Sequence, residues 1–137
     1  PMSRYDDIVA LGRASPSAVL RTSMREAEVA CLAQKYPQIP ADYIDYLREV
    51  GWGPIGNSTY VIYQGLMNAD AIYDAKDAKE LSHILFFGDD FSGYCGGFDT
   101  RRHFALVEVQ PTDMSCLDTG KSFEDFIKEI FRRQGAH

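Results

Sequence analysis

Two adjacent aspartates, Asp89 and Asp90, are the residue types in this sequence most suited to chemistry. They follow closely on the apolar run Ile84–Phe87. Paired carboxylates in such a place can bind a metal ion, transfer a proton or make a turn. Neighbouring residues on an extended strand point to opposite faces, and hard cations need further oxygen ligands spaced as in DxDxDG loops, a spacing that is absent here. The sequence therefore favours a turn, in which aspartate side chains accept from nearby amides and glycine supplies positive φ.

The two candidate nucleophiles near this turn, Ser92 and Cys95, lack the surroundings that catalysis needs. Ser92 is not in a GxSxG elbow, and no pattern links it to His83 or His103. Cys95 lies among glycines, where a small residue allows close packing. These glycines match neither phosphate-binding pattern, GxxxxGK[ST] or GxGxxG before a helix. We therefore predict a protein without catalytic residues, bound metal or cofactor.

The size and charge of the chain limit its partners. Its 137 residues fit one compact domain, and it carries a net charge of −6 with an isoelectric point near 4.9. An acidic surface disfavours nucleic acid and anionic membranes, because both attract cationic surfaces. It suits a basic protein partner, although solubility alone also explains such a charge. The sequence leaves the oligomeric state open between a monomer and a homodimer.

The cysteines, the apolar runs and the N-terminal residues bear on location. Cys31, Cys95 and Cys116 are odd in number and irregular in spacing, which indicates free thiols in a reducing compartment. No apolar run approaches the roughly 20 residues of a membrane span, and the N-terminal residues mix charged and polar types unlike a signal peptide. Pro1 before Met2 resembles a remnant of an expression vector. We expect a cytoplasmic protein.

Helical periodicity predicts helices towards both ends of the chain. Four are expected in its first part: Arg4–Gly12, a helix after a capping box at Ser23–Glu26, one from Pro40 to a stop at Gly51, and a short one near Asp70–Asp74. The clearest helix follows the capping residue Ser122. Its apolar residues repeat at i, i+3, i+4, i+7 and i+8, so they must pack on a sheet. They are Phe123, Phe126, Ile127, Ile130 and Phe131.

Segments rich in β-branched and aromatic residues predict the strands Thr59–Gln64, Ile84–Phe87, Tyr94–Asp99 and Phe104–Gln110. The unbroken apolar run in Ile84–Phe87 indicates a central strand covered on both faces. The short connections favour antiparallel hairpins over parallel crossovers. Helices at the ends with strands between them predict an α+β fold, a single domain with a central, mostly antiparallel sheet and helices packed around it.

Two sequence blocks, taken together, resemble the SUKH superfamily, which includes fungal regulators of cell-wall synthesis and bacterial toxin-immunity proteins. IPADYIDYLREVGWG, Ile39–Gly53, is similar to that family's Leu-Pro-x-x-Tyr-x-x-Phe-Leu helix. HILFFGDDFSGYCGGFD, His83–Asp99, is similar to its strand–turn–strand signature. The matching positions of the second block are Ile84, Gly88, Asp89, Asp90, Gly93, Phe98 and Asp99. From this resemblance we expect a SUKH-like domain over residues 23–137 and an N-terminal extension over residues 1–22.

The resemblance implies a binding protein rather than an enzyme. Many members neutralise a toxin, often a nuclease, from a competing cell. We therefore expect an immunity protein whose acidic surface meets a cognate toxin or another basic protein. The residues expected to contact the partner are four acids and two aromatics: Glu49, Asp89, Asp90, Asp99, Trp52 and Tyr94. Trp52 is equally compatible with the edge of the core. Two alternatives stay open, a regulatory scaffold for an endogenous partner and a small ligand-binding or enzymatic domain.

Overall fold

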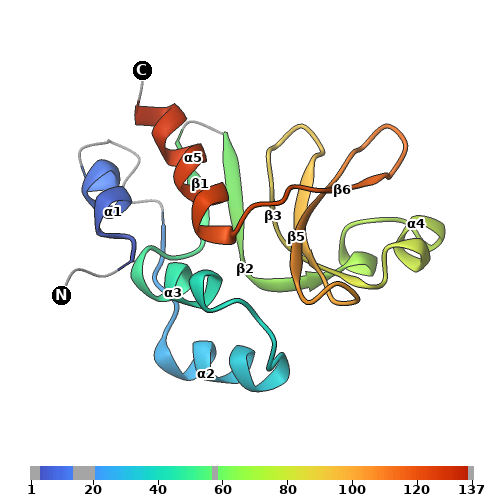
Figure 1. The fold of residues 1–137 in the computed structure, drawn as a ribbon, viewed down its shortest axis with the longest axis horizontal. Coiled ribbons are helices and arrows are strands. Elements are labelled where there is room, and N and C mark those ends of the chain that lie inside the picture. The colour runs from blue at the N-terminus through green and yellow to red at the C-terminus, as the bar shows by residue number, and fades with distance from the viewer. Residues whose placement is uncertain (1–3, 14–20, 57–58, 136–137) are drawn as a thin grey trace.

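The computed structural model describes residues 4–13, 21–56 and 59–135. A six-stranded sheet runs through it, and each strand pairs antiparallel with the next one in sequence (Figure 1). The strands are β1 (Gly53–Ile55), β2 (Tyr60–Asn68), β3 (Ile84–Asp89), β4 (Cys95–Asp99), β5 (Ala105–Val109) and β6 (Cys116–Asp118). The predicted α+β class, the single antiparallel sheet and its hairpins are confirmed. The sequence does not predict β1 and β6, which are three residues long each.

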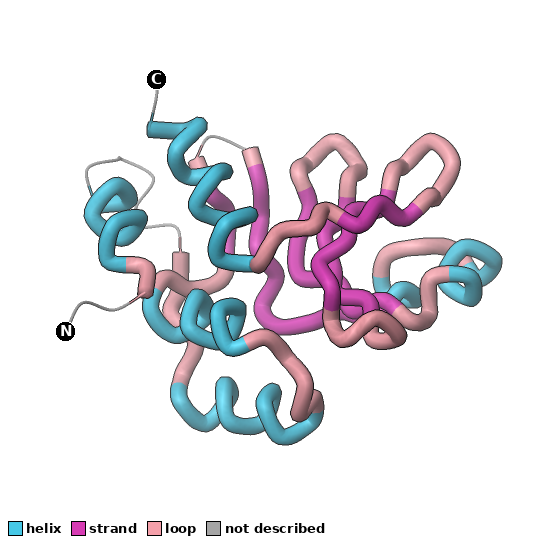
Figure 2. The backbone as a smooth tube through the Cα atoms, viewed as in Figure 1, coloured by secondary structure: helices cyan, strands magenta, loops and turns pink. Residues whose placement is uncertain are grey.

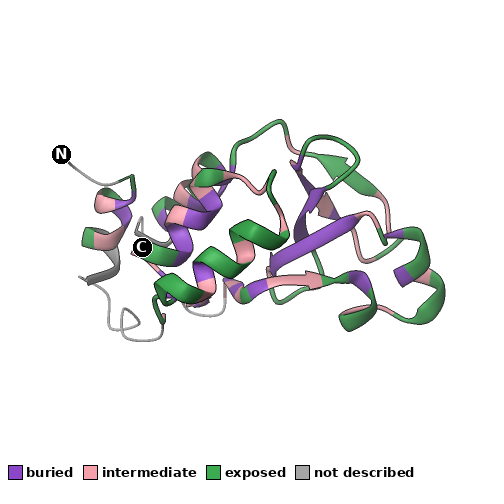
Figure 3. Cartoon of the chain, turned by 90° about the horizontal axis from the view of Figure 1, so that it is seen from below, coloured by how far each residue is buried: buried purple, intermediate pink, exposed green. Residues whose placement is uncertain are grey.

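Helices cover the two faces of the sheet unequally. On one side lie α1 (Asp6–Arg13), α2 (Glu26–Lys35), α3 (Ala41–Glu49) and α5 (Phe123–Gly135), and their apolar residues share the main core with the sheet (Figures 1 and 3). At its centre, the ring of Phe87 lies 5.1 Å from the rings of both Phe98 and Phe123. The other face carries a smaller core under the 3₁₀ helix η2 (Ala69–Ala71) and α4 (Ala75–Glu80). β3 contributes Phe87 to the first core and Phe86 to the second, as predicted for a central strand.

The start of α2 departs from the sequence prediction. The prediction of a capping box at Ser23–Glu26 is wrong, because the N-cap residue of α2 is Arg25 and its side chain makes no capping hydrogen bond. The cause is tertiary. The preceding residues are held extended against α3, where the amide of Met24 donates to the carbonyl of Leu47 at 2.8 Å. That contact prevents the serine from adopting the position that a capping box requires.

The ends of α3 and the start of α4 follow local sequence more closely. Pro40 is the N-cap of α3, and Gly51 ends the helix with a φ of +107° while its amide donates to the carbonyl of Tyr46 at 2.9 Å. The short helix predicted near Asp70–Asp74 is displaced. Asp74 instead caps α4, since its carboxylate accepts from the amide of Asp77 at 3.0 Å.

The helices at the two ends of the chain meet on the main core. All residues of the predicted stripe of α5 are buried, and Ser122 caps the helix by accepting from the amide of Asp125 at 3.1 Å. The early helix is also present as α1, and Tyr5 and Ile8 are part of the main core. The division at residue 22 into an extension and a domain stays a prediction.

Candidate functional site

The connection between β3 and β4 is a turn organised by the two aspartates. One carboxylate oxygen of Asp89 accepts from the amide of Phe91 at 2.8 Å. One oxygen of Asp90 accepts from the amide and hydroxyl of Ser92, both at 2.9 Å, and from the amide of Tyr94 at 3.0 Å. These bonds confirm the turn predicted from the sequence. They also make the loop rigid, because most of its amides have a fixed acceptor.

Asp89 is further tied to the sheet. Its second oxygen accepts from the hydroxyl of Tyr63 on β2 at 2.6 Å. Burial, and then this bond to Asp89, raise the pKa of Tyr63 well above its ordinary value, so the phenol stays a donor. Asp89 is half-buried, and its two oxygens link the loop to β2.

The loop holds a large apolar side chain in solvent. Phe91 is 52% exposed and has a φ of +67°. A left-handed backbone costs an L-residue other than glycine roughly 1–2 kcal/mol. Tyr94 beside it is 37% exposed. Sequence reasoning selected Tyr94 but missed Phe91. The available signal was a phenylalanine between Asp-Asp and Ser-Gly, where a turn offers no strand face on which to bury it.

The connection between β5 and β6 lies against this loop. A Cβ added to Gly93 would approach the Cβ of Pro111 to 2.9 Å, and Figure 2 shows both connections at one end of the sheet. We call residues 89–94 and 110–115 together the hairpin-tip surface. It contains three aspartates and no lysine, arginine or histidine. The hairpin-tip surface is therefore acidic, with two exposed aromatic side chains.

The other predicted contact residues lie elsewhere and serve the fold. Glu49 accepts from the amide of Tyr5 at 3.1 Å and so holds the start of α1. Trp52 is half-buried against the main core and pairs with Thr22 in an isolated bridge. Asp99 is 7% exposed and accepts from the amide of Arg101 in the turn at the opposite end of β4. Of the six predicted residues, the structure brings together Asp89, Asp90 and Tyr94.

A polar cavity of about 430 Å³ opens beside the hairpin-tip surface, between the sheet and α5. Its lining is Thr59, Tyr60, Asp90, Glu108, Lys121, Phe126, Glu129, Ile130 and Arg133. Burial, and then the charge of Asp90, raise the pKa of Glu108 above its ordinary value. Lys121 is already paired with Glu129 at 2.6 Å. Sequence reasoning did not find this cavity, because its residues come from four distant segments.

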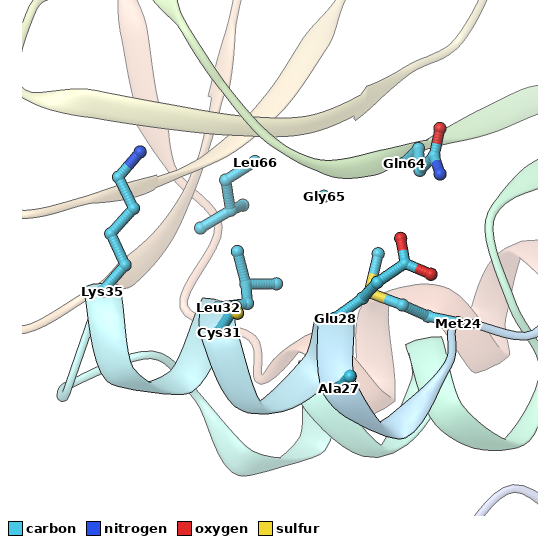
Figure 4. A pocket seen from close by; sticks show the side chains of 9 residues that line it. All are labelled: Met24, Ala27, Glu28, Cys31, Leu32, Lys35, Gln64, Gly65 and Leu66. Atoms are coloured by element: carbon cyan, nitrogen blue, oxygen red, sulfur yellow. The ribbon is translucent and has the colours of Figure 1, made fainter.

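A second hollow, of about 400 Å³, lies between α2 and β2 (Figure 4). Its lining is Met24, Ala27, Glu28, Cys31, Leu32, Lys35, Gln64, Gly65 and Leu66. β2 bulges here, since Ile62 pairs with Gly88 and Met67 with Phe86. The groove is mainly apolar, and its polar groups stand at its rim. It has the character of a gap under a bulged strand rather than of a reactive centre.

The two candidate nucleophiles of the sequence, Ser92 and Cys95, both have structural surroundings. Ser92 gives its hydroxyl to the turn, and Cys95 is buried with a pKa that burial raises. All three cysteines are free, as predicted. Within the described residues, no group of three or more His, Cys, Asp or Glu side chains could hold a metal ion. In the same ranges, no helix is long and apolar enough to cross a membrane.

Comparison with known proteins returned no matching family model, no matching curated protein and no matching solved structure. The resemblance to the SUKH superfamily therefore stays a prediction from the two sequence blocks. The geometry of the hairpin-tip surface and of the cavity beside it carries the functional argument.

Proposed function

We propose that this chain is a non-catalytic binding protein of the immunity type, which neutralises a basic toxin such as a nuclease by covering its active surface. The observation that carries the proposal is Phe91, an exposed aromatic in a strained conformation on a rigid loop. Strained residues that persist in a fold point to a function that needs them. An aromatic anchor is the residue type most enriched at binding hot spots.

The rigidity of the loop favours affinity. The bonds to Asp89 and Asp90 already fix the backbone from residue 89 to residue 94, so little entropy is lost when a partner binds. Phe91 and Tyr94 would supply the apolar centre of the interface. The hydrogen-bonded turn around them would supply its polar rim.

The charge of the hairpin-tip surface favours a basic partner. Three aspartates, on a surface that contains no lysine, arginine or histidine and on a chain of net charge −6, attract a cationic surface and orient it during encounter. Nucleases are basic because their substrate is a polyanion. The resemblance of His83–Asp99 to the SUKH signature supports the same proposal, since that block contains the loop.

The test is protection and binding with a toxin domain encoded next to this chain. Wild-type protein should restore growth of cells that express the toxin and should bind it in solution. Phe91→Asn should weaken binding by about 30-fold or more, since hot-spot truncations cost about 2 kcal/mol or more. Asparagine tolerates the left-handed backbone, so the loop should keep its shape.

The matched control is Leu117→Asn on β6, which removes a side chain of similar exposure, 47%, outside the hairpin-tip surface. It should bind like the wild type. Equal affinity of Phe91→Asn and wild type would overturn the assignment of the surface. A wild-type chain that neither binds nor protects against the toxin would overturn the proposed function.

A further inference from the structure

The polar cavity beside the hairpin-tip surface contains a buried hydroxyl without a partner. Tyr60 is 3% exposed, and among the described residues its phenolic oxygen has no hydrogen-bond partner. A buried polar group without a partner is costly, and the large majority of buried side-chain polar atoms in native proteins have one. Tyr60 is one of the residues that line the cavity.

Two glycines guide this hydroxyl towards Glu108. A Cβ on Gly88 would lie 2.8 Å from the Tyr60 ring, and a Cβ on Gly96 would lie 2.5 Å from its oxygen. The ring therefore crosses β3 and β4 in the space that the missing side chains leave. Gly96 pairs directly with Glu108 on β5, so the hydroxyl ends beside the residue opposite Glu108. Burial, and then the charge of Glu108, raise the pKa of Tyr60.

Among the described residues, neither of two carboxylates in the cavity, Asp90 and Glu108, forms an ion pair. Burial, and then the charge of Asp90, raise the pKa of Glu108, whereas the charges of Lys121 and Arg133 lower it. Lys121 is engaged by Glu129. Arg133 is exposed, and within the described residues it forms no ion pair. The lining of the cavity therefore includes two carboxylates without an ion pair in the described structure and one phenol without a hydrogen-bond partner there.

We propose that this cavity binds the guanidinium group of an arginine side chain supplied by the basic partner, with Asp90, Glu108 and the Tyr60 hydroxyl as its acceptors. The inference rests on the proposed function and names the partner group that its surface recognises. Guanidinium fits better than ammonium. It spreads five donors over a plane, is weakly hydrated and stacks on aromatic rings, and Phe126 is part of the cavity wall.

The cavity can be tested on the isolated chain with N-acetyl-arginine amide, followed by NMR at the amides of Gly96 and Glu108. We expect saturable shifts and an affinity about tenfold higher than for N-acetyl-lysine amide. Glu108→Gln should weaken binding about tenfold or more, as expected for a lost charged acceptor. Tyr60→Phe should weaken it about threefold to tenfold.

A matched control separates the role in binding from a role in the fold. Tyr46 also has a buried hydroxyl without a partner in the described structure, but it lies outside the cavity. Tyr46→Phe should leave the affinity for the arginine amide unchanged. Equal binding of the lysine amide, no binding of the arginine amide, or preferential binding of phosphate through Lys121 and Arg133 would overturn the inference.

The complex with the toxin distinguishes the two proposals. If Phe91→Asn weakens the complex and Glu108→Gln does not, the arginine inference fails while the proposed function stands. If the arginine amide binds the isolated chain but the toxin does not, the guanidinium site stands and the proposed function fails. Weakening by both variants supports both.

Discussion

Two phenylalanines at opposite ends of β4, Phe91 and Phe104, adopt the same left-handed backbone, with φ of +67° and +58°. Phe104 is 9% exposed, and its ring lies 6.2 Å from the ring of Phe98 in the main core. Phe91 is 52% exposed. Burial therefore offsets the backbone strain of Phe104 but not that of Phe91. Core packing thus explains the conformation of Phe104, whereas that of Phe91 needs a partner to explain it.

The turns at the two ends of β4 are both closed by aspartates. Asp99 closes its turn by accepting from the amide of Arg101 at 3.0 Å, much as Asp89 and Asp90 close theirs. The Asp99 turn continues into two arginines and a histidine, whereas the hairpin-tip surface has no cation. The same side-chain chemistry thus shapes both turns. The candidate site is distinguished by its lack of cationic residues and by its exposed aromatic side chains, because aspartates close both turns.

The largest expected effect is on the buried member of the pair. Phe104→Ala should lower the free energy of unfolding by about 3 kcal/mol, because it removes apolar burial and leaves a cavity. Urea denaturation measures this loss. A loss below about 1 kcal/mol would mean that the core does not offset the strain at residue 104.

Asp90 is expected to matter next. Asp90→Ala removes the acceptor of three donors and should cost about 1–2 kcal/mol in the free energy of unfolding. Asp113→Ala in the neighbouring loop is the control, because this carboxylate serves only the Ser115 region, and it should cost about 0.5 kcal/mol. Equal losses for both variants would contradict the organising role of Asp90.

The exposed phenylalanine should behave in the opposite way to Phe104. Phe91→Asn should leave the free energy of unfolding unchanged or raise it by up to about 1 kcal/mol, since asparagine relieves left-handed strain and no core contact is lost. Thermal and urea unfolding of this variant provide the measurement. A clear loss of stability would show that Phe91 is structural, and would remove the main support for the binding surface.

The smallest effect concerns pH. A carboxyl whose folded pKa is raised, such as Glu108, stabilises the fold below the unfolded pKa and loses that contribution as pH rises through the folded value. Glu108→Gln should therefore be more stable than wild type at pH 7, by about 0.5 kcal/mol. The difference should vanish near pH 4. Glu129→Gln should change stability in the opposite direction, because Lys121 lowers the pKa of Glu129.

Much of the fold can be predicted from local sequence. The predictions that failed concern places where contacts between elements decide the structure. The stripe of α5, the apolar run of β3 and the stop at Gly51 are periodic or conformational signals, and each is confirmed. The capping box at Ser23–Glu26 failed because a contact with α3 overrides it. β1 and β6 were missed because three residues are too few for a pattern, and their pairing partners define them.

The candidate site was predictable only in part. The turn at Asp89 and Asp90 can be predicted from residue type. The exposure of Phe91 depends on the orientation of the β3–β4 connection relative to the rest of the fold. The cavity depends on Tyr60 and Glu108, which are distant in sequence but line one cavity, and Gly88 and Gly96 leave room for the Tyr60 ring. No local pattern encodes this arrangement. It is a product of strand register.

The short outer strands and the bonded loop have a consequence for how this protein behaves at high concentration. β1 and β6 offer another chain only three residues each for edge pairing. In the loop that exposes Phe91, the amides of Phe91, Ser92 and Tyr94 are already taken by aspartate oxygens. An apolar side chain is thus displayed where these three amides are already bonded, so it can serve recognition with little tendency to start edge-to-edge aggregation.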